Sequence, residues 1–224
     1  MTFRSKVIIG ILVIMLLILI IPLYFLLSWK PRTPEGSTEA TTNNDKTVVL
    51  HLQENRENIR GTDVQMLFLT VTGDDSDGGS IVSGKGYYQN SSRNILFLVG
   101  EDKTAHWLFP KNDQRVFTIR QLPDGEKNKD VPTQALLLDY ADQDTNKDQV
   151  INDYDSHILA LIQPSGNQLK PILKNVNRVI SAEIVKDKVA IVYQIGKELR
   201  FARFNTATFE QELDKQLTVM PDKL

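Results

Sequence analysis

The chain has 224 residues, of which 41% are hydrophobic and 24% are charged, and its formal net charge at pH 7 is −2. This balance is typical of a globular protein, and it argues against the clustered positive charge with which proteins bind a nucleic-acid backbone. The absence of cysteine excludes disulfides, thiolate metal sites, thiol nucleophiles and lipid attachment to cysteine, but it identifies no cellular compartment.

The first predicted element is an uncleaved transmembrane helix at 7–29. These 23 residues carry no charge, and at about 1.5 Å per residue they give roughly 34 Å of helix, enough to cross a bilayer core. Tyr24 and Trp29 lie near the far end, where amphipathic rings favour the membrane interface. A cleaved signal peptide is the alternative, but the apolar run is too long for one and lacks a small-x-small cleavage site. We therefore interpret 1–29 as a tail and membrane anchor.

The next segment, 30–46, is rich in Pro, Thr, Asn and Glu and has no apolar run. Such a composition cannot bury a core, so it predicts a flexible linker. Positive charges flank the anchor almost equally on its two sides. A short N-terminal tail with a large domain behind it favours an orientation that places 47–224 on the extracytoplasmic side of the membrane. We expect a single-pass protein with this domain on the periplasmic side of the inner membrane.

From Thr47 onward the hydrophobic period changes to two, which is typical of strands. Seven short apolar or alternating runs follow one another, and turn signals such as "GEDK", "PSGN" and "IGKE" separate them. The runs are "TVVLHLQ", "VQMLFLTVT", "NILFLVG", "TQALLLDY", "HILALIQ", "RVISAEIV" and "KVAIVYQI". The pattern predicts a mainly antiparallel β domain.

An internal repeat lies within this domain. Residues 95–122 and 158–185 align without a gap at an offset of 63, and Ile95/Ile158 and Arg115/Arg178 are among the identical pairs. Each copy has the pattern strand, tight turn, strand, loop, strand, and one more strand precedes each copy. We therefore predict repeated four-stranded units, with 188–205 as the start of a third.

Tandem four-stranded units are typical of propeller blades. The repeated hairpin, "ILALIQPSGNQLKPIL" in the second copy, resembles the hairpin that recurs in TolB-type propellers. The resemblance implies an incomplete propeller-like stack, because a closed propeller needs at least about four blades. A β-sandwich built by duplication, or chance similarity between two hairpin-rich segments, are the alternatives.

The tail at 206–217 has Phe209, Leu213 and Leu217 at four-residue spacing, and Thr208 and Gln211 fit a capping box. This spacing predicts a short C-terminal helix that covers an exposed sheet edge. A further strand is the alternative.

The stretch "DTNKDQVINDYD" at 144–155 carries acidic or amide side chains at its first, third, fifth, ninth and twelfth places. Calcium prefers six to eight oxygen ligands, and a short loop can surround the ion if alternate side chains point inward. The register resembles the EF-hand loop, and its dockerin-type form in particular. Carried over position by position, the resemblance implies one calcium ion held by Asp144, Asn146, Asp148, the carbonyl of Val150, Asn152 and Asp155.

Gln149 departs from this pattern, since the sixth place normally holds a glycine with positive φ. Strands, and not paired helices, are also predicted on both sides of the loop, which disfavours a calcium sensor that opens a helix pair. The alternative is a polar turn, since Asp and Asn favour turns. A second acidic loop at 73–80 occupies the matching place in the first repeat, and we interpret it as a solvated flexible loop, because no acid follows at the twelfth position. A decayed relative of the calcium site, with Asp75 and Asp77, is the alternative.

No G-x-S-x-G, Walker, H-E-x-x-H or dinucleotide-binding motif occurs in the sequence. His51, His106 and His157 stand outside any metal or nucleophile pattern, and His51 and His157 fall in predicted strands. Trp107 and Phe109 are expected on one face of a strand, where packing in the core is the ordinary explanation.

The sequence thus favours a membrane-anchored binding or scaffold module of the cell envelope, with a protein partner of unknown identity. An envelope hydrolase with residues assembled across the fold, or a calcium-dependent regulator, are the alternatives.

Overall fold

The computed structural model describes residues 39–40, 48–72 and 92–221. The chain divides into two compact units, Met1–Gly36 and Ser37–Leu224, and every described residue belongs to the second. The predicted anchor at 7–29, nearly all of the predicted linker, and the acidic loop at 73–80 lie outside the described residues. Within the described residues, no helix is long and apolar enough to cross a membrane.

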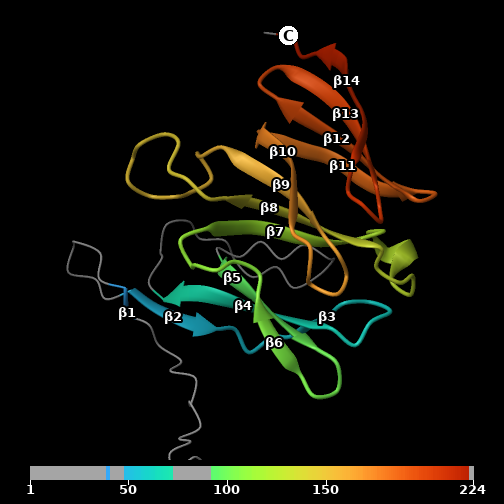
Figure 1. Cartoon of the computed structure of the whole chain (residues 1–224). Helices are drawn as coiled ribbons and strands as arrows, with labels where there is room; N and C mark the ends of the chain where they lie inside the picture. Colours follow the sequence, from blue (N-terminus) through green and yellow to red (C-terminus); the bar gives the residue numbers. More distant parts are fainter. Residues whose placement is uncertain (1–38, 41–47, 73–91, 222–224) are drawn as a thin grey trace, which may run out of the picture. The chain divides into compact units, whose positions relative to one another are not determined.

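The described part of the chain is almost entirely β structure, as predicted, and its one helix is the short 3₁₀ turn η1 (Glu126–Asn128). All strand pairs are antiparallel (Figure 1). The strands are β1 (Glu39–Ala40), β2 (Val48–Leu52), β3 (Glu57–Asn58), β4 (Gln65–Thr72), β5 (Ser92–Val99), β6 (Thr104–Trp107), β7 (Arg115–Leu122), β8 (Ala135–Ala141), β9 (His157–Ile162), β10 (Lys170–Val176), β11 (Arg178–Val185), β12 (Lys188–Ile195), β13 (Glu198–Asn205) and β14 (Gln211–Val219).

The strands form up-and-down arrays in chain order. β11, β12, β13 and β14 make a separate four-stranded sheet. In the larger sheet, β7, β8, β9 and β10 follow one another, and β2, β4, β5 and β6 are also neighbours in that order. A single residue pair, Ser92 with Val116, joins β5 to β7 and so links these two arrays. Figure 1 shows β7–β9 between the β2–β5 strands and the β11–β14 sheet.

The predicted four-stranded units have wrong boundaries. The strands of the two copies occur as expected, and β7 and β11 begin and end 63 residues apart. However, β7 pairs along its length with β8, and β11 pairs with β12, so the last strand of each predicted unit begins the next array. Asn177 alone separates β10 from β11, and the chain changes sheets there. A sequence repeat has the same period wherever a unit is taken to start, so it could not reveal this shift by one strand.

Two hydrophobic cores lie on opposite faces of the β7–β10 array. Successive side chains of a strand point to opposite faces, so Leu136 and Leu138 of β8 belong to one core, whereas Ala135 and Leu137 belong to the other. The first core also contains side chains of β4 and β5, and the second contains those of β12 and β13. Because both faces are covered, the run at 135–141 is almost continuously apolar and does not alternate.

The predicted C-terminal helix is wrong, and the alternative of a further strand is correct. β14 pairs with β13 over most of its length. Phe209 is 2% exposed in the second core, but Leu217 is 46% exposed, so the residues at four-residue spacing do not share a buried face. The strand is joined to its sheet by backbone pairing with β13 and by ion pairs of Glu212, which lies 2.6 Å from Lys188. The open edge of β13 thus outweighs the local helical pattern.

A glycine in the β9–β10 turn fits this turn against the β5–β6 hairpin. Gly166 is buried and has a φ of 80°, and its carbonyl oxygen lies 3.2 Å from Nε2 of His106. A Cβ atom at this position would stand 2.5 Å from the ring of Phe97, which is fully buried. Gly196, in the β12–β13 turn, also has a positive φ of 56°, but a Cβ atom there would meet no atom within 4 Å.

We predict that Gly166→Ala lowers the free energy of unfolding by about 1–3 kcal/mol more than Gly196→Ala does. Both variants place a side chain in a left-handed conformation, so their difference isolates the clash with Phe97. Urea unfolding measures both. Equal losses would mean that backbone conformation alone governs the two sites.

Candidate metal centre

The loop predicted to bind calcium connects two neighbouring strands of the β7–β10 array. β8 ends at Ala141 and β9 begins at His157, and residues 142–156 between them form neither strand nor helix. Figure 1 shows the loop in yellow, projecting beyond the ends of β8 and β9. The strands therefore hold the two ends of the loop close together, as the sequence predicts.

Three of the predicted ligands lie side by side. Oδ2 of Asp148 accepts hydrogen bonds from Nδ2 of Asn146 at 3.0 Å and from Nδ2 of Asn152 at 2.9 Å. The third, fifth and ninth places of the loop thus form one group of polar side chains. The backbone N–H of Val150, then the amides of Asn152 and Asn146, hold the pKa of Asp148 below its usual range, so this carboxylate is ionised at neutral pH.

The first predicted ligand, Asp144, shapes the turn. Its Oδ1 accepts the N–H groups of Lys147 at 2.6 Å and Asp148 at 3.2 Å, and its Oδ2 accepts the N–H of Gln149 at 2.7 Å. These bonds wrap the backbone around one carboxylate. The loop is therefore a tight turn whose amides point inward.

Gln149 adopts the backbone conformation that the sixth place of such a loop requires. Its φ is 73°, and that of Lys147 is 65°. Left-handed conformations cost a residue with a Cβ atom roughly 1–2 kcal/mol, and the hydrogen bonds to Asp144 offset part of this cost. Gln149 therefore takes the conformation that glycine normally takes at this place, and the conformation is strained for a residue with a Cβ atom.

The closing carboxylate, Asp155, is directed at backbone amides. Asp155 is 5% exposed. Its Oδ1 accepts the N–H groups of Thr145 at 2.6 Å and Asn146 at 3.2 Å. Its Oδ2 accepts the N–H of Asn152 at 2.8 Å. Burial raises the pKa of Asp155, but these hydrogen bonds outweigh burial and the pKa lies below its usual range. Asp155 therefore ties the start of the loop to its end.

The remaining predicted positions are placed as follows. The N–H of Val150 donates to Oδ1 of Asp148 at 2.9 Å, and the Val150 side chain is 44% exposed. Ile151, between Val150 and Asn152, is half-buried. Among the described residues, no three His, Cys, Asp or Glu side chains form a group that could hold a metal ion. The polar group at the third, fifth and ninth places contains only one carboxylate, because the other two are directed at amides.

A histidine–aspartate pair at the base of the loop was not anticipated from the sequence. Nδ1 of His157 lies 2.8 Å from Oδ1 of Asp139, its ring stacks on Phe117 at 4.2 Å, and its Nε2 lies 3.4 Å from the carbonyl oxygen of Asp153. Burial lowers the pKa of His157, but the hydrogen bond and charge of Asp139 raise it above its usual value. In the β8–β9 register Asp139 pairs with Leu159, and Leu159 follows His157 by two residues on the same strand. The correct strand pairing is therefore the signal that could have revealed the His157–Asp139 pair.

The aromatic pair is separated. Phe109 is 6% exposed in the first core, whereas Trp107 is 44% exposed. β6 ends at Trp107, so the strand does not continue far enough to place both rings on one face. The prediction of a shared face is therefore wrong.

A second polar cluster, around Arg200 and Asp214, lies between β10 and the β12–β14 strands. The helix that the sequence predicts at 206–217 does not bring Asp214 beside Arg200, whereas the pairing of β14 with β13 does.

These features define a class of protein, an antiparallel β domain with a polar Asp/Asn loop between two adjacent strands. The chain matches no protein-family model and no curated protein. Its function is therefore inferred from its own residues.

We predict that Asp155→Asn destabilises the protein by about 1–3 kcal/mol at pH 7, because the new amide faces a backbone N–H that has lost its acceptor. The difference from the native protein should shrink as the pH falls. The folded-state pKa of Asp155 is depressed, so its contribution is present above the unfolded value near 3.9 and is lost as the pH falls through the folded value. Urea unfolding between pH 7 and 3 measures this.

Asp153→Asn is the matched control, since Asp153 is exposed in the same loop and the change in charge is the same. Its effect should stay within about 0.5 kcal/mol. Equal effects of the two variants would show that the amide network around Asp155 contributes nothing specific.

Proposed function

We propose that this chain is a membrane-anchored, extracytoplasmic β-domain protein of the cell envelope. It serves as a binding or scaffold module and carries one structural calcium ion in the loop at 144–155. The observation that supports the calcium site best is the backbone of Gln149, which takes a positive φ of 73° at the place where the loop must turn. A residue that is not glycine adopts this strained conformation only where its surroundings favour it.

The chemistry of the loop suits a hard cation. Calcium prefers carboxylate, amide and carbonyl oxygens, and the ligands in this proposal are Asp144, Asn146, Asp148, the carbonyl of Val150, Asn152 and Asp155. A carboxylate has about four lone-pair sites, so Asp144, which accepts three N–H groups, keeps capacity for an ion. Asp155 accepts four hydrogen bonds and would have to exchange at least one of them for the ion. Bound calcium supplies positive charge to a loop whose carboxylates otherwise depend on N–H donors.

The propeller-like interpretation of the domain also belongs to this proposal. Three arrays, β2–β4–β5–β6, β7–β10 and β11–β14, each follow an up-and-down order, and each chain crossing leads from the last strand of one array to the first of the next. This order supports a resemblance to TolB-type propellers, with three blades where closure needs at least about four.

We predict that calcium raises the midpoint of thermal unfolding of the full chain and has no effect on an Asp144→Ala/Asp148→Ala variant. An ion that binds only the folded state stabilises it by about 2.7 kcal/mol at 100 times its Kd, which corresponds to roughly 5–10 °C for a domain of this size. Calorimetry with calcium or with a chelator measures the shift.

The matched control is Asp142→Ala/Asp153→Ala, which removes the same charge from exposed positions beside and within the loop. This variant should keep the calcium response. If calcium changes neither the native protein nor this control, the loop is a polar turn and the metal site is ruled out.

We further predict that deletion of residues 1–29 moves the protein from the membrane fraction to the soluble fraction, because the apolar run at 7–29 is the proposed anchor. Fractionation of cells measures this, and deletion of residues 31–36 in the linker is the control that should stay with the membrane. Protease added outside the inner membrane should digest the domain of the anchored protein. Protection of the domain would contradict the proposed orientation.

A further inference from the structure

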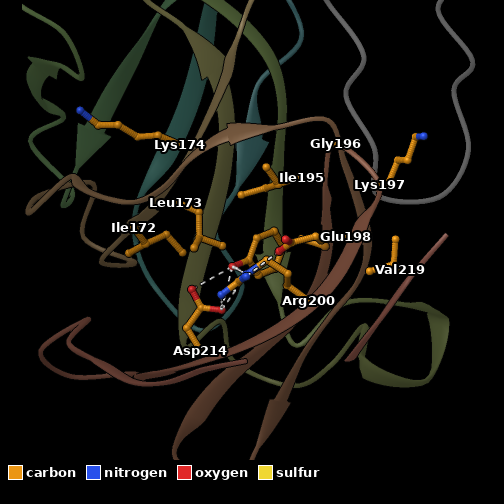
Figure 2. Close-up of a pocket in the computed structure, with 11 residues that line it drawn as sticks. Ile172, Leu173, Lys174, Ile195, Gly196, Lys197, Glu198, Arg200, Asp214 and Val219 are labelled. Carbon is orange, nitrogen blue, oxygen red and sulfur yellow. Dashed lines mark hydrogen bonds and ion pairs between the residues drawn. The ribbon is translucent and has the colours of Figure 1, made fainter. Parts of the chain in front are cut away.

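A pocket of about 690 Å³ lies between β10 and the strands β12–β14. Its volume is in the range of sites that accept small ligands or single side chains. One wall comes from Ile172, Leu173 and Lys174 of β10, where β-bulges interrupt the pairing with β9. Bulges re-aim side chains, and they give this edge of the β7–β10 array an irregular surface. Figure 2 shows the pocket with Arg200 and Asp214 at its centre.

The floor of the pocket is a hydrogen-bonded network around Arg200. Nη1 of Arg200 donates to Oε2 of Glu198 at 2.7 Å, and Nη2 donates to Oδ1 of Asp214 at 3.0 Å. The hydroxyl of the buried Tyr193 lies 3.0 Å from both carboxylate oxygens of Asp214 and donates to this group. Burial raises the pKa of Tyr193, so the hydroxyl keeps its proton at neutral pH. The network therefore holds Asp214 and Arg200 in fixed positions.

The three charged side chains of the floor, Glu198, Asp214 and Arg200, carry a net charge of −1, although Lys174 and Lys197 bring the charge of the whole pocket lining to +1. Two carboxylates, Glu198 and Asp214, face one guanidinium. Lys174 and Lys197 also line the pocket, but Figure 2 shows both side chains pointing away from the Arg200–Asp214 pair. The side chains of Glu198 and Asp214 are 42% and 22% exposed, so water or a ligand reaches both. Glu198 accepts one hydrogen bond from the described residues, which leaves acceptor capacity for a ligand.

The walls above this floor are apolar. Ile172, Leu173, Ile195 and Val219 contribute alkyl side chains. An alkyl wall above an anionic floor complements a ligand with an aliphatic stem and a cationic head, which is the build of a lysine or arginine side chain. An anion bound at Arg200 would have to displace two carboxylates, and a neutral apolar ligand would desolvate charges without pairing them.

We propose that this pocket binds an alkyl cation, namely the lysine or arginine side chain of a partner protein or a free amine of the same chemistry. This inference rests on the binding role proposed above, but it does not depend on the calcium site. The carboxylates of Glu198 and Asp214 receive the cationic head, and the alkyl side chains of the walls cover the stem.

The test uses the full chain and ligand-observed NMR. The probes are Nα-acetyl-lysine N-methylamide, its norleucine analogue, which replaces the ammonium by a methyl group, and n-butylamine. The lysine probe should bind, and the norleucine probe should bind at least about tenfold more weakly. Equal binding of lysine and norleucine would overturn the proposal. If butylamine binds with the same affinity as the lysine probe, a free amine suffices as ligand. If butylamine binds more weakly, the backbone of a partner contributes to binding. Both outcomes support recognition of an alkyl cation by this pocket.

Glu198→Gln is the informative variant, because it removes one charge from a side chain that is already 42% exposed. It should weaken lysine binding about tenfold, whereas Glu183→Gln, on the exposed part of β11, should leave binding unchanged. Val219→Lys should abolish binding by placing a tethered cation at the rim, and Val219→Met should not. Lysine binding that survives both Glu198→Gln and Val219→Lys would refute the site.

The calcium response, measured on the same samples, separates the two proposals. Loss of lysine binding in Glu198→Gln with an intact calcium response attributes the loss to the pocket. If the native chain responds to calcium but binds none of the probes, the proposed ligand of the pocket is wrong and the calcium site is supported. If the native chain binds the lysine probe but does not respond to calcium, the calcium site is wrong and the pocket proposal is supported.

Discussion

The burial of β8 and β9 on both faces is the constraint on which the rest of the described structure depends. Leu136 and Leu138 pack into one core and Ala135 and Leu137 into the other, so a shift of one residue in the register would exchange the two sets. The strand pairing that satisfies both cores also brings Asp139 beside His157 and fixes the ends of the loop at 142–156. The second core in turn carries Phe204 and Tyr193, and Tyr193 lies beneath the pocket. Both candidate sites thus inherit their positions from one central array.

The strands were predictable because their signals are local. The alternating and continuous apolar runs coincide with the observed strands, and turn residues separate them. What failed depended on partners distant in sequence. The grouping of strands into arrays was shifted by one because β7 finds its partner in β8, and β14 is a strand because the edge of β13 was available. The Arg200–Asp214 pair could not be foreseen until that strand was in register.

The loop at 144–155 illustrates the same limit at a smaller scale. Its sequence indicates which oxygens are present, and three of the residues do gather, but it does not indicate which groups those oxygens accept. Asp144 and Asp155 each accept backbone amides at both oxygens. The amides that Asp144 accepts include those of Lys147 and Gln149, whose conformations are left-handed. A turn of this kind is self-supporting in its hydrogen bonds and still negatively charged. The amide network therefore accounts for the shape of the loop, and the excess of carboxylate charge is what a cation would balance.

The edge strand β10 explains why the pocket lies where it does. Pro171 removes one backbone donor, and bulges interrupt the register on both sides of Leu173, so the free edge is a poor template for another strand. β11 follows after a single residue and belongs to a different sheet, which leaves a wedge between β10 and the β12–β14 strands. An edge that discourages backbone pairing can still present side chains. Recognition at this place would therefore proceed through side chains and charge, and the carboxylates of Glu198 and Asp214 are partly accessible to solvent there.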